Sequence, residues 1–440
     1  MSSIPSTNTI GRGAPIGVTA LSALSVLQRL LLGVVVLEIP IQIDTYLFYQ
    51  EQWAEFGAIG GFNLSLTTIC LAALYLTWMV EFATATGLPG RRRLWFSIPL
   101  TTYLTIVGVS FLMAENRLLA LNSIALLGQS YLLYFYVSNR VRTKDDVVYL
   151  VALLLVALAI QGAIIIGLYA VGHDIHVGPI AATVGIDLRI GGTLGSPNGA
   201  ASYLSLLIAP ALAVLATSLP RGFKLLAMVA MVLGGFGVVL TLSRGGWIAV
   251  GLSTVLFCLL AWYRGRISGW LPLSFVIAVL VIGGIFHNSI IDRLVNDDQG
   301  SAQSRVALAE SAWRMIADHP ALGVGVNNST VVGARYAMRP EYRQDWFYTT
   351  HNKYLLEWEE LGVLGLGAFL WFLLSTLRTG WKSWRRRDTI LSPIALGLAV
   401  AILGQMTHML VDTFNDRPLI QALWLNAALL AAIYRVQEDD

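Results

Sequence analysis

Charged side chains are scarce in this sequence. Asp, Glu, Lys and Arg make up 12% of the 440 residues, against about 25% in a soluble globular protein. Hydrophobic residues make up 56%, and the mean hydropathy is +0.67. So few charges cannot cover the surface of a soluble domain of this size, and disordered chains need high charge and low hydrophobicity. The composition excludes both classes and indicates a protein that crosses a membrane many times.

Other features are also missing. Cys70 and Cys258 are the two cysteines and both lie in apolar runs, so a disulfide framework is not expected. The net charge of +3 comes without a clustered basic face, which argues against a nucleic-acid partner. The short basic loops contain no Walker motif, which disfavours an ATP-driven pump unless a partner supplies the ATPase. The polar N-terminal residues lack a charged region and cleavage site, so we expect the first apolar stretch to remain as a membrane helix.

Long apolar runs are abundant, and a membrane-spanning helix needs about 20 such residues. We expect an all-α polytopic membrane protein with about twelve transmembrane helices. Residues 1–288 should hold the first nine, 289–353 one long periplasmic loop with short amphipathic helices, and 354–440 the last three. The first run is interrupted by Arg29 and Pro40. The expected spans are 22–42, 62–86, 94–113, 117–138, 147–171, 199–218, 223–242, 245–263, 268–288, 354–378, 391–412 and 418–434.

The distribution of Lys and Arg predicts the orientation. Most of the 29 basic residues fall in short loops and termini on one side of this arrangement. Short loops rich in Lys and Arg face the cytoplasm. Both termini are therefore expected in the cytoplasm. The other side should then hold 43–61, 172–198, 243–246, 289–353 and 413–417.

The long loop begins with an amphipathic pattern over residues 301–317. Val306, Ala309, Trp313 and Ile316 would share one helix face. The residue before a proline disfavours helix, so Asp318-His319-Pro320 should end this element.

Arginine recurs every fourth residue later in the same loop, at Arg335, Arg339 and Arg343. On a helix these side chains would form a basic stripe able to dock an anionic lipid headgroup or a phosphorylated saccharide. Pro340 interrupts such a helix, and a solvated charged face is the alternative interpretation.

Arg189 begins a glycine-rich segment that ends in Ser196-Pro197-Asn198, where a helix should start. Glycines let main-chain N–H groups approach an anion, and a helix N-terminus offers free donors. An ordinary loop-to-helix turn uses the same residue types. The second feature is Ser243-Arg244-Gly245, between two apolar runs with almost no loop. Arginine suits bidentate phosphate binding, whereas snorkelling to the headgroups is the alternative.

His351 and Asn352 enter a helix that carries Glu360 nine residues after the histidine. Imidazole accepts a proton near neutral pH, so His351 is a candidate general base. A helix cap is the alternative role for His351 or Asn352. The remaining histidines show no metal-ligand spacing, so we expect no metal and no cofactor.

Taken in order, these motifs resemble the O-antigen ligase and polymerase superfamily of bacterial envelope enzymes. The resemblance extends over roughly residues 185–375. The matching residues are Arg189, Gly192, Pro197, Asn198, Ser243, Arg244, Gly245, Arg305, His319, Pro320, Gly323, Gly325, His351, Asn352, Leu355, Glu360 and Gly362.

The resemblance implies a metal-independent, inverting glycosyltransferase of the bacterial inner membrane with a periplasmic active site. Such an enzyme moves a glycan from undecaprenyl pyrophosphate to an acceptor hydroxyl within a phospholipid bilayer. Arg189 and Arg244, helped by Asn198 and Arg305, would hold the pyrophosphate, and His351 would act on the acceptor hydroxyl. Asn352 and Glu360 are the candidates for supporting His351, and the motifs do not choose between them.

The acceptor separates the branches of this superfamily. A single long loop near the C-terminal third favours an O-antigen ligase, whose acceptor is the lipid A–core oligosaccharide. A polymerase that extends the lipid-linked glycan is the first alternative. A transporter or flippase is the alternative from another class, but it should carry more ionisable residues inside its spans. The sequence leaves the oligomeric state open.

Overall fold

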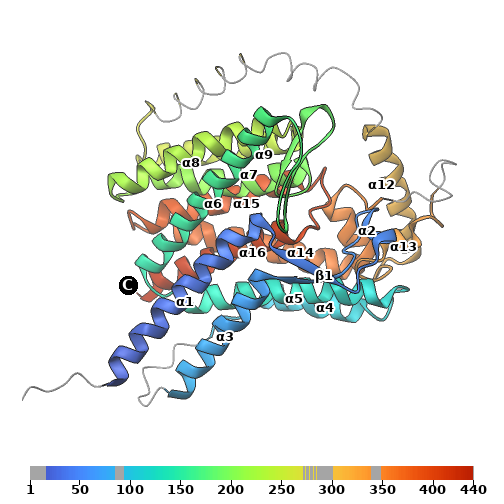
Figure 1. The fold of residues 1–440 in the computed structure, drawn as a ribbon, viewed down its shortest axis with the longest axis horizontal. Helices are drawn as coiled ribbons and strands as arrows, with labels where there is room; N and C mark the ends of the chain where they lie inside the picture. Colours follow the sequence, from blue (N-terminus) through green and yellow to red (C-terminus); the bar gives the residue numbers. More distant parts are fainter. Residues whose placement is uncertain are drawn as a thin grey trace, which may run out of the picture.

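The computed structural model describes residues 16–84, 94–270, 301–337 and 348–439, and single helical residues between 271 and 300. The chain is mainly helical (Figure 1). The long helices are α1 (Ile16–Ile41), α3 (Leu66–Thr84), α5 (Arg117–Arg140), α6 (Lys144–Val171), α7 (Pro197–Leu215), α8 (Arg221–Leu240), α9 (Arg244–Tyr263), α12 (Ser301–Asp318), α14 (Lys353–Trp384), α15 (Leu391–His408) and α16 (Arg417–Asp439). The shorter ones are α2 (Glu51–Ala54), α4 (Ile98–Ser110), α13 (Ser329–Gly333) and the 3₁₀ turn η1 (Ile186–Leu188).

Nine helices among the described residues are long and apolar enough to cross a membrane. They are α3, α5, α6, α7, α8, α9, α14, α15 and α16. The expected span 94–113 is represented by α4, which has only 13 residues. The expected span 268–288 lies largely outside the described residues. The described residues thus support a multi-pass helical protein with nine candidate spans, and the count of twelve stays a prediction.

The helices run between two distinct ends. The start of α1 and the end of α16 lie at one end, and α2, α12 and α13 lie at the opposite end, which we call the loop end (Figure 1). Helices α7, α15 and α16 are the most buried of the candidate spans. Helix α15 packs on α7 and α9, and α16 packs on α5. A Cβ atom at Gly404 of α15 would lie 2.5 Å from the main-chain oxygen of Ala249, so a small residue permits the close α9–α15 contact.

Two small antiparallel sheets depart from the all-α expectation. Strands β1 (Asp44–Leu47) and β2 (Phe62–Ser65) pair between α1 and α3. Strands β3 (Ile175–Val177), β4 (Ile180–Val184) and β5 (Ile190–Gly192) form the second sheet between α6 and α7. Each strand has only three to five residues, too few to show a clear alternating pattern in the sequence. The sheets shape the connections that precede α3 and α7.

Helix α14 is broken at Gly362, where φ is 68° and ψ is −174°. A Cβ atom at Gly362 would lie 2.1 Å from the main-chain carbon of Ala321, so the His319–Gly325 segment packs directly against the break. The main chain of Val363 donates to the Pro320 oxygen at 2.9 Å. The first part of α14 carries the buried Glu357, Glu359 and Glu360. These carboxyl groups lie within the expected span 354–378, and they pack against protein before the break.

The predicted amphipathic helix is present as α12, but only part of the predicted apolar face is buried: Ile316 is buried, whereas Val306 and Trp313 are not. Val306 and Trp313 are 53% and 52% exposed, whereas Leu308, Ala312 and Met315 are buried. The buried face is therefore shifted around the helix axis from the predicted one, and Ile316 belongs to both. Helix α12 packs against α14. The half-exposed Trp313 also meets the ring of Trp358 in α14 edge-on, with ring centroids 5.3 Å apart.

Candidate active site at the loop end

The glycine-rich segment and the Ser-Arg-Gly turn meet at Asn198. Arg189 Nη2 donates to Asn198 Oδ1 at 3.1 Å, and Ser243 Oγ donates to the same oxygen at 3.0 Å. Arg189 Nε also reaches the Thr241 main-chain oxygen at 3.4 Å. Residues separated by about 50 positions in the sequence therefore form one polar unit. Arg244 follows Ser243 directly and is half-buried.

Two helices begin at this unit. Ser196 caps α7 by accepting from the Gly199 N–H at 3.0 Å, and Ser243 caps α9 through the Gly246 N–H. The predicted helix start near Pro197 is confirmed. Leu188 and Leu242 precede Arg189 and the Ser243 cap with φ angles of 54° and 50°. Non-glycine residues rarely adopt this strained conformation, which is concentrated at functional sites.

The second part of the site is His351. Its Nδ1 atom lies 2.9 Å from the Thr349 main-chain oxygen. A carbonyl oxygen only accepts, so Nδ1 carries the proton and Nε2 keeps its lone pair. Burial lowers the pKa of His351 below its ordinary value, the Asp412 carboxylate and the Thr349 bond oppose this, and the charge of Arg305 lowers it further. His351 is therefore neutral at pH 7, with Nε2 available as a base.

The position of the His351 loop is fixed from outside α14. The Thr349 N–H and hydroxyl both donate to the Phe56 main-chain oxygen, at 2.8 and 2.9 Å. On the other flank the Lys353 N–H donates to the Met409 oxygen at 2.8 Å. The loop that carries α2 and the end of α15 together hold the imidazole in place.

Residues that the sequence analysis did not select lie beside this loop. His408 Nδ1 and Asp412 Oδ2 both contact Ser202 Oγ, at 3.0 and 2.9 Å. One turn further along, Ser205 donates to Gln405 at 2.9 Å. Gln405, His408 and Asp412 recur at helical spacing in an otherwise apolar run, which is the signal that would have revealed them.

His408 also contacts the second motif. A Cβ atom at Gly245 would lie 2.7 Å from its Nε2 atom. The glycine of the Ser-Arg-Gly turn is therefore required by close packing against a buried histidine. This contact places the Arg244 turn beside His408, which shares Ser202 with Asp412. The negative charge of Asp412 acts in turn on His351.

Asp416 adds a second carboxyl group near the start of α7. Its Oδ2 atom would lie 3.6 Å from a Cβ atom at Gly199. The surrounding protein, together with the charge of Asp412, raises the pKa of Asp416 to about 6. The side chain nevertheless stays accessible to solvent.

Arg305 in α12 completes the positive side of the site. It is half-buried. Its charge acts on His351 and, together with Asp412, on His408, which places it within electrostatic range of both rings. Helix α12 of the long loop thus places the charge of Arg305 near the start of α14 and the end of α15.

The two candidates for supporting His351 have other contacts. Asn352 caps α14 by accepting from the Tyr354 and Leu355 N–H groups at 3.0 and 3.1 Å. Glu360 accepts from the Asn327 and Ser329 N–H groups at 2.8 and 3.2 Å, and so fixes the turn before α13. Thr349 provides the hydrogen bond to His351 that these two were proposed to make.

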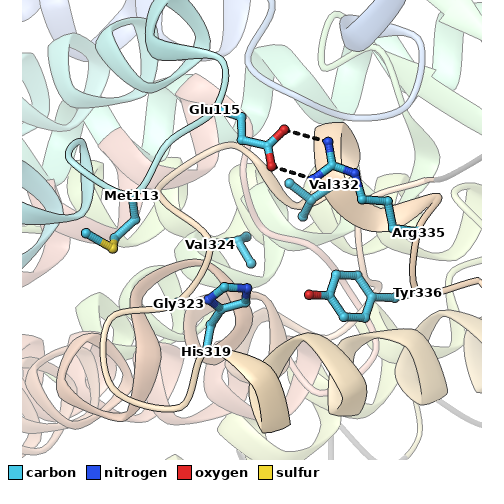
Figure 2. Close-up of a pocket in the computed structure, with 8 residues that line it drawn as sticks. All are labelled: Met113, Glu115, His319, Gly323, Val324, Val332, Arg335 and Tyr336. Atoms are coloured by element: carbon cyan, nitrogen blue, oxygen red, sulfur yellow. Dashed lines mark hydrogen bonds and ion pairs between the residues drawn. The ribbon is translucent and has the colours of Figure 1, made fainter.

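Arg335 lies in a different place from the three motifs. Its guanidinium group binds Glu115 in a bidentate ion pair at 2.5 and 2.7 Å (Figure 2). The pair borders a pocket of about 90 Å³ that His319 and Tyr336 also line. This volume suits about three water molecules. Arg339 and Arg343 lie outside the described residues, so the proposed stripe is not visible as a unit.

Arg417 is a cation at the loop end with a structural role. It forms two hydrogen bonds with Glu38 at 3.0 and 3.1 Å and a third contact with Asp44 at 3.2 Å. Arg417 and Glu38 are 4% and 3% exposed. The pair ties α16 to α1 beneath the site. Within the described ranges, no group of three or more His, Cys, Asp or Glu residues is arranged to hold a metal ion.

The helices and the site together define a multi-pass membrane protein whose polar centre gathers cations and a neutral imidazole where several helices end. Comparison with protein families places it more closely: residues 229–370, about a third of the chain, match the O-antigen ligase family. The resemblance seen in the sequence is thereby confirmed. The matched segment includes Ser243, Arg244, Arg305, His351 and Glu360. No curated protein matched the chain.

Proposed function

We propose that this protein is a membrane glycosyltransferase that moves a glycan from undecaprenyl pyrophosphate to the lipid A–core oligosaccharide. The observation that carries the proposal is the neutral His351, with Nε2 available as a base, in the electrostatic field of Arg305 and Asp412. The site offers a base for the acceptor and cations for the leaving group. The match to the O-antigen ligase family supports the same reaction class.

The proposed reaction is a direct displacement. The acceptor hydroxyl attacks the anomeric carbon of the donor sugar while the bond from that carbon to the pyrophosphate oxygen breaks. The hydroxyl proton passes to His351 Nε2, and the pyrophosphate leaves with the bonding electron pair. Attack from the face opposite the leaving group inverts the anomeric centre. General-base catalysis of this kind contributes about 10²- to 10⁴-fold to the rate.

Arg189 and Arg244 are proposed to stabilise the charge that develops on the pyrophosphate. Asn198 holds the Arg189 guanidinium at 3.1 Å, so this group needs little rearrangement during the reaction. Fixed donors directed at developing charge lower a barrier more than mobile ones. Arg305 is proposed to bind the same anion from α12. This arrangement needs no metal, because arginines neutralise the leaving group.

The proposed location is the bacterial inner membrane, with both termini in the cytoplasm and the site on the periplasmic face. The supporting observation is that the start of α1 and the end of α16 share one end of the bundle, while α2, α12 and α13 lie at the other (Figure 1). The sequence supports the same orientation, because most of the Lys and Arg residues fall in short loops and termini predicted on one side, as in cytoplasmic loops.

The test is a reconstituted transfer assay. Purified protein in liposomes receives undecaprenyl-pyrophosphate glycan and rough lipopolysaccharide, without ATP or added metal and with EDTA present. We expect glycan on lipid A–core, detected by gel and mass spectrometry. Growth of the lipid-linked glycan with an unmodified core would establish a polymerase instead. An intact donor that changes leaflet without a covalent product would establish a flippase.

A further inference from the structure

A second polar recess lies at the loop end, on the segment that carries α2. It has a volume of about 590 Å³ and is lined by Tyr49, Gln50, Glu51, Gln52 and Glu55. The recess is open to solvent, as a site for part of a long chain-like ligand must be.

Tyr49 forms a fixed aromatic platform in this recess. Cβ atoms at Gly60 and Gly61 would lie 2.9 and 3.1 Å from its ring, so the ring packs directly against the glycine backbone. The Gln50 N–H donates to the Gly60 oxygen at 2.8 Å and fixes the same turn. Tyr49 still keeps 54% of its surface exposed. A rigid, half-exposed ring is suited to stacking on the C–H face of a sugar.

The polar groups around the ring suit hydroxyl groups. The Gln50 amide is held by Asn116, whose Nδ2 donates to Gln50 Oε1 at 2.7 Å. Glu51 and Glu55 are exposed carboxylates on the same short helical turn. Carboxylates accept hydrogen bonds from hydroxyl groups, and amides both donate and accept. No Lys or Arg is among the lining residues, so a phosphorylated or acidic ligand would be repelled.

The recess is connected to the candidate base through two residues. Glu55 is followed by Phe56, whose oxygen accepts both hydrogen bonds from Thr349. Thr349 in turn accepts from His351 Nδ1. The segment that carries the recess is therefore bonded directly to the loop that carries His351.

We propose that this recess binds an uncharged segment of the glycan substrate, one or more sugars away from the reacting bond. The inference rests on the proposed glycosyl transfer for the identity of the ligand. Tyr49 supplies the stacking surface, and Gln50, Glu51 and Glu55 bind the hydroxyl groups. The segment belongs either to the donor glycan or to the outer part of the acceptor, because both present the same neutral hydroxyl-rich chemistry.

The direct test is binding, measured by saturation-transfer NMR on the full chain in lipid nanodiscs. The probes are uncharged oligosaccharides released from the donor lipid and from the core, with phosphorylated core oligosaccharide as the charged comparison. We expect one uncharged probe to bind, which identifies the source, and the phosphorylated one to bind at least about tenfold more weakly. Tyr49→Ala should weaken binding about tenfold, the order expected for one lost aromatic contact.

Two variants control this result. Tyr49→Phe keeps the ring and should bind within about twofold of the unmodified protein. Phe48→Ala removes the neighbouring ring, which is 73% exposed but does not line the recess, and should leave binding unchanged. Equal weakening by Phe48→Ala and Tyr49→Ala would overturn the site and assign this loop to membrane contact. So would a Tyr49→Ala protein that binds as well as the unmodified one.

Transfer kinetics separate this inference from the proposed function. Tyr49→Ala should raise KM for the substrate with the long glycan and leave kcat close to unchanged. A truncated substrate that carries a single sugar should show no difference between the two proteins. If the unmodified protein binds the probe but transfers nothing, the proposed function is wrong, and the assignment of the recess as a glycan-binding site is kept. If transfer proceeds without any Tyr49 effect on KM, the recess assignment fails and the proposed function stands.

Discussion

His351 donates through Nδ1 to the main-chain oxygen of Thr349 at 2.9 Å. This single bond fixes the tautomer of the imidazole and leaves Nε2 as the basic atom. Because the acceptor is a main-chain group, its position depends on the fold of the loop and not on another side chain. The strength of His351 as a base is then set by burial, Asp412 and Arg305.

Replacing His351 with alanine should reduce transfer by about 10²- to 10⁴-fold, because the acceptor hydroxyl loses its base. The measurement is kcat in liposomes, together with thermal stability by fluorescence-detected chromatography. His319→Ala is the matched control, since His319 is exposed and lines the small pocket beside Glu115. Transfer at the unmodified rate by a folded His351→Ala protein would remove the base assignment.

The pH profile should report a histidine with a lowered pKa. The ordinary value is about 6.5, and burial lowers it. Nε2 therefore stays unprotonated through neutral pH, and kcat/KM should fall only as the pH drops through a value below about 6.5. Arg305→Gln removes a charge that lowers this pKa, so the midpoint should move to higher pH. Asp412→Asn should move the midpoint to lower pH. A midpoint that stays unchanged in both variants would contradict the assignment of His351 as the base.

Arg244→Lys should lower kcat by about 10²- to 10³-fold, the typical effect of losing one fixed donor to developing charge. Lysine keeps the charge but replaces a planar fork with a point charge. Arg335→Lys is the matched control, because Arg335 pairs with Glu115 and with none of the proposed catalytic residues, and this exposed pair is worth about 1 kcal/mol or less. Full activity and donor affinity in Arg244→Lys would reassign Arg244 to contact with lipid headgroups.

Gly362→Ala should destabilise the protein and disturb the site together. A Cβ atom there would overlap the main chain of Ala321, and the φ angle of 68° disfavours alanine. The measurement is the yield of monodisperse protein and its midpoint of thermal unfolding. Gly367→Ala is the control in the same helix, because no atom lies within 4 Å of a Cβ at that position. A stable Gly362→Ala protein would mean that the break in α14 relaxes without loss.

Arg417→Met should destabilise the protein by about 3–5 kcal/mol, since it leaves Glu38 buried without its partner. The double variant Glu38→Gln with Arg417→Met should recover much of this loss. The measurement is thermal unfolding of the three proteins in one detergent. No recovery in the double variant would show that Asp44 also needs the guanidinium group.

Much of the architecture could be predicted from the sequence, because long apolar runs and helix-start residues are local signals. The helix start at Pro197 and the amphipathic helix over 301–317 are examples. The face that α12 buries could not be predicted, since apolar residues lie on more than one side of it. Val306 and Trp313 look like core residues in the sequence, yet about half of each stays exposed, because the contact of Trp313 with Trp358 of α14 covers only part of its ring.

The sequence by itself determined that this is a polytopic helical protein, and it selected the motifs that carry Arg189, Arg244 and His351. Composition and short motifs suffice for that, because burial in a bilayer and helix capping depend on residues close together in the chain. Only the tertiary structure decided that Asn198 joins the first two motifs, that Thr349 and not Asn352 orients His351, and that His408 and Asp412 belong to the site. These contacts span up to about 210 positions. Side chains so far apart meet only when the helices that carry them pack, and no local pattern records that packing.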